Sequence, residues 1–444
     1  MNYISRDIDS ELLLWKEDTH RKPLLLRGAR QVGKTSTVRE FAKHFDFFIE
    51  LDLNGSAIER QLFESDISTP ALWENLAAMY SIPNQSKNTL LFIDEIQACP
   101  AAINRLRYFY EQVPHLHVIA AGSLLEFVLQ DLPSFGVGRI RSLYLYPLSF
   151  SEFLRANGQQ GLDRLIKQAS PNQPLLDPMH NLALQHLKIF LVIGGMPEVV
   201  SEYVRTHDLY RCQQVLDDLI ISYRDDFKKY HQRIPEARIN ETFLSVAQQA
   251  QGKFVYSRVG ENLRAQSVKD ALQTLILAGL VYPITHTSAN GIPLGSEVNE
   301  KYRRMIMMDT GFIQRILHLD LKELLVLNDF EAINKGAIAE VFVGTELMKA
   351  QGMHTPHALF CWCNEEKNRQ AEVDYIVQKG DQIIPIEVKA GRRGAMQSMR
   401  VFMELKKLSI GVRTAMENFS QYEKIKVYPL YAIANLVNKQ IDTD

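Results

Sequence analysis

Residues 28–35 of the chain read GARQVGKT, and this stretch decides the fold of the N-terminal third. It fits the pattern Gly-x-x-x-x-Gly-Lys-Ser/Thr, in which backbone N–H groups of a glycine-rich turn surround a phosphate. Residues 24–27 (LLLR) predict a buried strand that leads into the turn, and residues 34–45 (KTSTVREFAKHF) predict an amphipathic helix that leaves it. A chance glycine turn is the alternative, and the flanking strand and helix make it the weaker one.

The residues of this loop have separate predicted roles. Lys34 would reach the β- and γ-phosphates of a nucleotide, and the Thr35 hydroxyl would occupy one coordination position on Mg²⁺. The residues predicted to bind the nucleotide are Gly28, Ala29, Arg30, Gln31, Val32, Gly33, Lys34, Thr35 and Ser36.

A second motif, LLFIDE at residues 90–95, is an apolar strand that ends in two acids. In an open parallel sheet the carboxyl end of a strand lies where ligands gather, beside the phosphate loop. Asp94 is predicted to hold Mg²⁺, and Glu95 to orient and deprotonate the attacking water. A strand end that simply meets solvent is the alternative, and the pairing with the phosphate loop disfavours it.

Two further segments carry weaker signals. HVIAAGS (residues 117–123) predicts a buried strand, and Ser123 just past its end could sense the γ-phosphate or close an ordinary turn. GRIRSLYLYPLSF (residues 138–150) predicts another strand, preceded by Arg139 and Arg141. Either arginine could neutralise transition-state charge, in cis or across a subunit interface, or could be a solvated loop residue. Strands near 24, 48, 90, 118 and 143 alternate with helices, which is typical of a parallel sheet covered on both faces.

Length and composition describe a folded chain of several domains. The 444 residues suggest about two to four domains, and 46% apolar with 23% charged residues is typical of a globular protein. The net charge of -2 gives no global field that attracts nucleic acid. Four cysteines do not form a disulfide framework, the start lacks an apolar signal core, and no apolar run is long enough for a bilayer. A cytoplasmic protein without a membrane partner is therefore expected.

The middle of the chain has helical periodicity followed by a helix–helix–strand pattern. Residues 151–235 carry apolar side chains at three- and four-residue spacing and are predicted to form a lid. Residues 236–300 fit a winged helix-turn-helix, with Ser267 as the N-cap of its third helix. That helix offers few side chains for reading bases, so packing or nucleotide sensing is favoured over DNA binding.

The C-terminal third predicts a helix and then three strands. The helix covers residues 333–352, and the strands cover LFCWC (359–363), AEVDYIV (371–377) and QIIPIEVKA (382–390). Alternate residues of a strand share a face, so Glu387 and Lys389 lie together. An exposed charge pair of small energetic value is the simplest interpretation of those two residues alone.

Several of these motifs together resemble a known family. RGARQVGKT, LLFIDEIQACP, AAGSLLEF, LYLYPLSFSEFL and GGMPEVV resemble the AAA+-related P-loop ATPases of bacteria and archaea that carry a C-terminal domain of unknown function with a nuclease-like motif. The resemblance covers nearly the whole chain and implies ATP as the nucleotide. Ala29 stands where that group often has proline, a difference in loop stiffness that leaves phosphate ligation unchanged.

The C-terminal pattern resembles the PD-(D/E)XK nuclease fold on four residues: Glu340, Asp374, Glu387 and Lys389. The resemblance implies Mg²⁺ bound by Asp374 and Glu387, with Glu340 reaching it through water. Lys389 would orient the attacking water or stabilise developing charge. Val373 stands in place of the proline of the motif name, and the Gln-x-x-x-Tyr of the family is absent. Basic residues that could contact phosphates follow at Arg392, Arg393, Arg400 and Lys406.

The sequence therefore predicts an α/β multidomain protein. Its segments are a parallel-sheet P-loop AAA+-type ATPase core (1–150), a helical lid (151–235), a winged helix (236–300) and an α/β nuclease-like domain (301–444). The expected function is Mg²⁺-dependent ATP hydrolysis coupled to a nuclease-like domain that binds nucleic acid, with cleavage left open. Two alternatives stay open: a catalytically silent binding module in a regulator, and a protein-remodelling ATPase. Oligomerisation is also left open.

Overall fold

The computed structural model describes residues 3–83, 86–131, 138–230, 234–250, 252–261, 263–319, 335–364, 371–389 and 396–438. The chain divides into two compact units. The N-terminal unit is Met1–Tyr146 with Met353–Pro356, and the C-terminal unit is Pro147–Gly352 with His357–Asp444. No helix among the described residues has the length and apolar character needed to cross a membrane.

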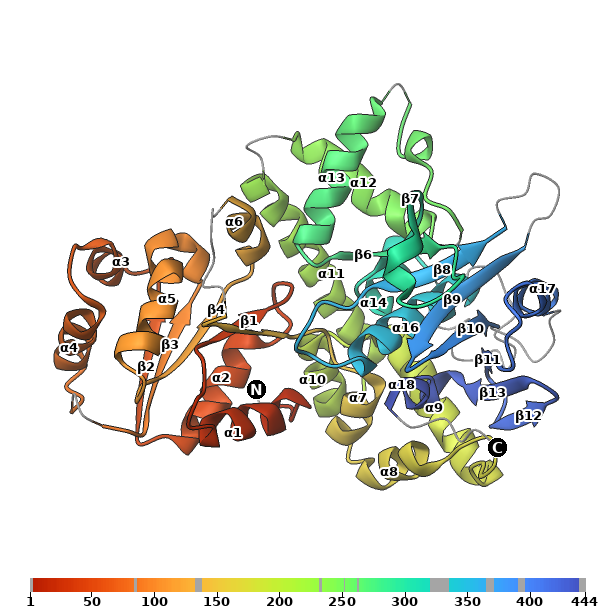
Figure 1. Cartoon of the computed structure of the whole chain (residues 1–444), viewed down its shortest axis with the longest axis horizontal. Helices are drawn as coiled ribbons and strands as arrows, with labels where there is room; N and C mark the ends of the chain where they lie inside the picture. The colour runs from red at the N-terminus through yellow and green to blue at the C-terminus, as the bar shows by residue number, and fades with distance from the viewer. Residues whose placement is uncertain are drawn as a thin grey trace. The chain divides into compact units, whose positions relative to one another are not determined.

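The N-terminal unit is built on a five-stranded parallel sheet with the order β2-β3-β4-β1-β5 (Figure 1). The strands are β1 (Leu24–Arg27), β2 (Phe47–Asp52), β3 (Thr89–Asp94), β4 (His117–Ala121) and β5 (Arg141–Tyr144). All neighbouring strands pair in parallel. The predicted strands and the predicted parallel α/β class are confirmed. Because β4 lies between β1 and β3, the segments that follow these three strands meet at one edge of the sheet.

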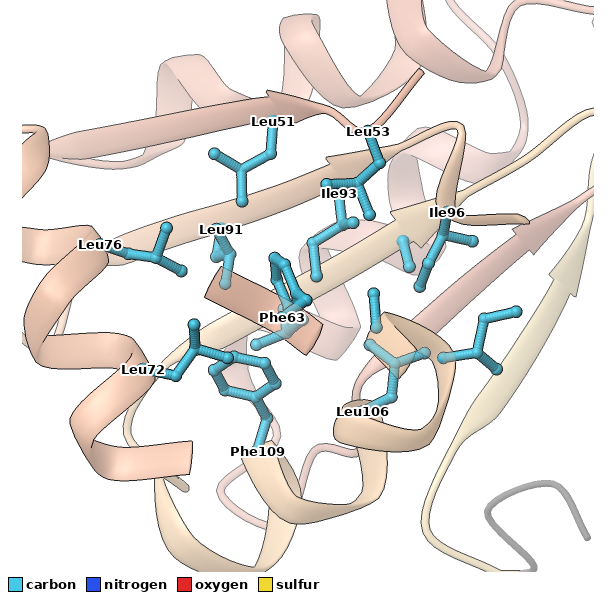
Figure 2. Close-up of a cluster of buried hydrophobic side chains, with 14 of the residues drawn as sticks. Leu51, Leu53, Phe63, Leu72, Leu76, Leu91, Ile93, Ile96, Leu106 and Phe109 are labelled. Carbon is cyan, nitrogen blue, oxygen red and sulfur yellow. The ribbon is translucent and has the colours of Figure 1, made fainter. Parts of the chain in front are cut away.

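Helices cover both faces of this sheet. The helices of the unit are α1 (Ile8–Glu17), α2 (Lys34–Phe41), α3 (Ala57–Glu64), α4 (Thr69–Met79), α5 (Pro100–Gln112) and α6 (Leu125–Asp131). Side chains of α3, α4 and α5 pack with Leu91 and Ile93 of β3 and with Val118 of β4 in a buried core, part of which Figure 2 shows. His117 precedes Val118 and therefore points to the opposite face, where its ring contacts Trp15 of α1.

The C-terminal unit begins with a helical region, as the sequence predicts. Its helices are α7 (Phe150–Ala156), α8 (Gln160–Gln168), α9 (Asp177–Ile193), α10 (Pro197–Thr206), α11 (Leu209–Asp226), α12 (Glu236–Gln248), α13 (Ala265–Leu277) and α14 (Thr310–Ile316). The third helix of the predicted winged helix is α13. Its N-cap position is Arg264, three residues before Ser267, so the N-cap role predicted for Ser267 is wrong.

An eight-stranded sheet forms the other half of this unit, with the order β12-β13-β11-β10-β9-β8-β6-β7. The strands are β6 (Val281–Thr287), β7 (Val298–Met307), β8 (Leu359–Cys363), β9 (Glu372–Lys379), β10 (Gln382–Val388), β11 (Gly411–Ala415), β12 (Ser420–Tyr422) and β13 (Ile425–Pro429). The predicted wing is the hairpin of β6 and β7, and β6 also pairs with β8. The sheet therefore continues across the boundary predicted at residue 300, which falls inside β7.

In the described part of the chain, this unit also contains the helices α16 (Lys335–Ala350), α17 (Gln397–Leu405) and α18 (Asn435–Asn438). Helix α16 contacts β7 and β10, and α17 contacts β9 and β10. Short 3-10 helices lie at Ala42–His44, Ile96–Ala98, Phe227–Tyr230, Tyr256–Arg258, Leu294–Glu297 and Leu430–Ala432. The succession of α16, β8, β9 and β10 confirms the elements that the sequence predicts for this part of the chain.

A buried polar network joins distant segments of the C-terminal unit. The Asp309 carboxylate accepts hydrogen bonds from the N–H groups of Gly195 (2.7 Å) and Gly311 (2.9 Å). The Leu148 N–H donates to the Gly195 carbonyl (2.7 Å), and the Leu148 carbonyl accepts from Lys349 Nζ of α16 (2.9 Å). Because Asp309 is fully surrounded by protein, burial raises the pKa of its carboxyl group. The GGMPEVV motif therefore has a structural role here.

Replacing Gly194 with alanine should destabilise the C-terminal unit. Gly194 has a φ of +73°, and a Cβ atom would lie 1.8 Å from Asp309 Oδ1. Gly158 has the same φ of +73° and no neighbour within 4 Å, so Gly158→Ala is a control for adding a Cβ atom at a positive φ without a steric contact. We expect Gly194→Ala to lower the free energy of unfolding by about 2 kcal/mol more than Gly158→Ala in urea denaturation. Equal losses in the two variants would contradict the contact.

Candidate functional site

The loop between β1 and α2 has the backbone that a phosphate site requires. Gly28 and Gly33 have φ angles of +139° and +99°, which only glycine adopts without strain. At Gly28 a Cβ atom would lie 2.1 Å from the Leu145 carbonyl oxygen, so the close approach of that carbonyl also requires glycine. The helix α2 begins at Lys34, directly after the loop. Its N-terminal N–H groups therefore face the position where a phosphate would bind.

Lys34 points back into this loop. Its ammonium group donates to the carbonyl oxygens of Gly28 (2.8 Å) and Ala29 (2.7 Å). Burial lowers the pKa of Lys34 to about 8, and the carboxylates of Glu95 and Asp94 oppose that shift. The positive charge lies where the phosphates of a bound nucleotide would meet it.

Thr35 and Asp94 form the pair that the sequence predicts for Mg²⁺. The Thr35 hydroxyl donates to Asp94 Oδ2 at 2.7 Å, and the Glu95 N–H donates to Asp94 Oδ1 at 2.9 Å. Burial raises the pKa of Asp94, and these two hydrogen bonds counteract the rise. A hydroxyl and a carboxylate beside a phosphate loop are hard oxygen ligands, so the residues present fit a Mg²⁺ ion.

Glu95 is held by two polar neighbours. Its backbone has a φ of +50°, an uncommon conformation for a residue other than glycine. Glu95 Oε2 accepts from Ser123 Oγ at 3.3 Å and also from Gln97 Nε2. The predicted Ser123 therefore lies beside the predicted base. The contact with Gln97 was not predicted from the sequence, although Gly122 makes room for it: a Cβ atom there would lie 2.1 Å from Gln97 Oε1.

Arg139 lies away from this group. It precedes β5, which runs parallel to β1, whereas the phosphate loop follows β1. Arg139 is therefore at the amino edge of the sheet, opposite to the loop, and its Nε pairs with Glu111 Oε1 at 2.5 Å. Arg141 Nη2 lies 3.8 Å from Asp18 Oδ2. A transition-state role for Arg139 in cis is therefore wrong, because the strand direction places it at the far edge.

A buried arginine that the sequence analysis missed supports the loop. Arg6 is 7% exposed and donates to the carbonyl oxygens of Val32 (3.1 Å) and Tyr146 (2.7 Å). Nothing in the pattern around residue 6 marks this role, because the partners are distant in the sequence. Arg6 links the segment before α1 to the phosphate loop and to the end of the sheet.

The C-terminal unit holds a second cluster of charged side chains. Arg304 of β7 is 1% exposed and pairs with Glu340 of α16 and, at 3.4 Å, with Glu372 of β9. Its Nη1 also lies 3.3 Å from the Asp374 carbonyl oxygen and 3.5 Å from Asp374 Oδ1. Two of the acidic residues named by the nuclease resemblance, Glu340 and Asp374, thus contact a cation contributed by β7. Arg304 was not predicted.

Glu387 lies at the other side of this cluster. The register that pairs Ile386 with Tyr375 places Glu387 next to Asp374, whose Oδ2 accepts from the Val388 N–H at 2.8 Å. Lys389 Nζ donates to Glu387 Oε1 at 2.6 Å, which confirms that the two side chains share a face. Burial raises the pKa of Glu387 to about 7, and the neighbouring Asp374 carboxylate adds to the rise.

The predicted metal ligands of the C-terminal unit are only partly brought together. Among the described residues, no group of three or more His, Cys, Asp or Glu side chains is placed to hold a metal ion. Glu340 is paired with Arg304, so the geometry does not support its predicted contact with a metal through water. Asp374 and Glu387 remain, and two carboxylates suit Mg²⁺, which keeps several waters. Arg392 and Arg393 lie outside the described residues.

Three segments of the chain match family models. Residues 20–154 match an AAA domain. This match covers most of the N-terminal unit, and residues 20–154 are called the AAA domain after it. Residues 184–323 and 335–433 match two domains of unknown function, DUF8612 and DUF4143. The DUF8612 match covers residues 184–323 and therefore extends across the domain boundaries that the sequence predicts at residues 235 and 300.

Solved structures similar to this chain are distant. A Walker-type ATPase of Pyrococcus abyssi (PABY2304) is 15% identical, with 71% of this chain and 96% of that chain covered and a TM-score of 0.46. The Aeropyrum pernix ORC1 protein, solved in complex with DNA, is 14% identical over 73% and 95% of the two chains, with a TM-score of 0.30. No curated protein matches the chain. The evidence for a nucleotide site therefore comes from the match to the AAA domain and from the geometry of the phosphate loop.

Proposed function

We propose that the AAA domain binds ATP together with Mg²⁺ and hydrolyses it. The observation that carries this proposal is the grouping of Lys34, the Thr35–Asp94 pair and the Ser123–Glu95 pair at one edge of the sheet. These residues come from separate segments of the sequence, and the match of residues 20–154 to an AAA domain supports the same conclusion.

Each side chain has a distinct part in this hydrolysis. Thr35 and Asp94 would hold Mg²⁺, which neutralises phosphate charge when bound. Lys34 places a positive charge beside the β- and γ-phosphates and favours the charge that develops on them. Glu95 accepts a proton from the attacking water, and Ser123 and Gln97 orient its carboxylate through their hydrogen bonds.

We further propose that the nucleotide state controls the C-terminal unit through the helical region and the β6–β7 hairpin, and that this unit acts on nucleic acid. The order of α16, β8, β9 and β10 and the proximity of Asp374, Glu387 and Lys389 support a nuclease-like site. A likeness of fold does not establish cleavage, so the activity rests on the experiment that follows.

ATP hydrolysis should be measured with Mg²⁺ alone and then with single- or double-stranded DNA, with RNA, or with candidate protein partners. Stimulation by nucleic acid, together with cleavage that disappears in Asp374→Ala, would support the full proposal. Stimulation without cleavage would identify a silent binding module. Stimulation by a protein alone would identify a remodelling ATPase. Cleavage that persists in Asp374→Ala would exclude this site as its source.

A further inference from the structure

We propose that the C-terminal acidic cluster takes one divalent cation, between Asp374 and Glu387, and that Arg304 fills the place where a second would bind. This inference rests on the proposed nuclease-like site and specifies its metal content. It also assigns Glu340 a new role as the partner of Arg304.

Arg304 occupies one half of the cluster. Its guanidinium is buried, and it pairs with Glu340 and Glu372 and reaches the carbonyl and one carboxylate oxygen of Asp374. Burying a guanidinium is costly unless acids and hydrogen bonds compensate for it. These partners are therefore needed to stabilise Arg304. A metal ion placed between Glu340 and Glu372 would face this fixed positive charge at close range.

In the other half of the cluster, Lys389 pairs with Glu387 Oε1, and the second oxygen of the same carboxylate is left for a cation. Glu387 is 6% exposed, and its Oε2 is buried without a hydrogen-bond partner in the described part of the chain. A buried carboxylate oxygen without a partner is costly, and a hard divalent cation would satisfy it. Asp374 lies beside it in the strand register and offers the second carboxylate.

The charge balance gives the same number of ions. The cluster contains four carboxylates, those of Glu340, Glu372, Asp374 and Glu387, and two cations, Arg304 and Lys389. When all four acids are ionised, as they would be beside a bound cation, two negative charges are left over, and one divalent ion neutralises them. Sites with two metals hold them about 3.5–4 Å apart and need acids around both, whereas the acids on one side here already hold Arg304.

Manganese binding to the full-length chain tests this assignment. The ion is counted by electron paramagnetic resonance without nucleotide, in an Asp94→Asn background that weakens the metal site of the AAA domain. We expect one Mn²⁺ per chain. The affinity should fall at least about tenfold in Asp374→Asn and in Glu387→Gln, and should change less than about twofold in Glu340→Gln, which retains an acceptor for Arg304.

The outcomes distinguish a failure of the role given to Arg304 from a failure of the metal site itself. Two bound Mn²⁺ ions, or a loss in Glu340→Gln as large as in Asp374→Asn, would overturn the role of Arg304 and leave the nuclease-like site standing. No bound Mn²⁺ would overturn the metal site itself. In Arg304→Ala a second Mn²⁺ should bind, and a folded variant that still binds one would contradict the assignment. If that variant does not fold, the ion count in the Asp94→Asn parent and the Glu340→Gln result still decide.

Discussion

Replacing Glu95 with glutamine should lower the rate of ATP hydrolysis by about 100-fold or more and leave ATP binding intact. The amide keeps the size of the side chain and an oxygen that can accept from Ser123 and Gln97. It cannot take a proton from the attacking water, so only the chemical step is affected. Phosphate release measures the rate, and titration with a fluorescent ATP analogue measures binding.

Glu74→Gln is a suitable control for this variant. Glu74 lies exposed on α4, so the same chemical change at that position should leave hydrolysis at the wild-type rate. If Glu95→Gln also hydrolyses ATP at the wild-type rate, Glu95 is not the base. A parallel loss of ATP affinity would instead indicate a role in holding the nucleotide.

Replacing Lys34 with alanine should weaken nucleotide binding about 10- to 100-fold, because a hydrogen bond to a charged group contributes about 1.5–3 kcal/mol. The loss should be greater for ATP than for AMP, since the predicted contacts are with the β- and γ-phosphates. Isothermal titration calorimetry with each nucleotide measures the difference.

Lys34 also bonds the carbonyl oxygens of Gly28 and Ala29, so the variant could disturb the loop itself. Thermal unfolding without nucleotide measures that effect separately. Lys87→Ala removes an exposed lysine elsewhere in the unit and should leave affinity unchanged. Wild-type affinity for ATP in Lys34→Ala would refute the assignment of the phosphate loop.

The elements of the AAA domain were predictable because its signals are local. The glycines and Lys34 lie within one turn, and β3 is a short apolar run with an acid at its end. The sequence alone places Asp94 near Thr35, since parallel strands end at one edge. The same rule, applied to the start of β5, would have placed Arg139 at the opposite edge.

Contacts made by single residues over long distances were not predictable. Arg6 and Arg304 belong to none of the motifs that the sequence offers, and their acceptors lie far along the chain. The position of Arg304 depends on β6 pairing with β8, which joins the β6–β7 hairpin to the C-terminal sheet. The local hydrophobic pattern does not determine which strands pair. The acidic cluster was therefore predicted without Arg304, the cation at its centre.

Helix α16 makes polar contacts with two separate parts of the C-terminal unit. Glu340 is paired with Arg304 near its start, and Glu346 and Lys349 near its end bond the backbone at Phe150 and Leu148. At 1.5 Å per residue, the nine residues from Glu340 to Lys349 span about 14 Å of stiff helix. We therefore expect a displacement of residues 148–150 to move Glu340 and to change its pairing with the buried Arg304.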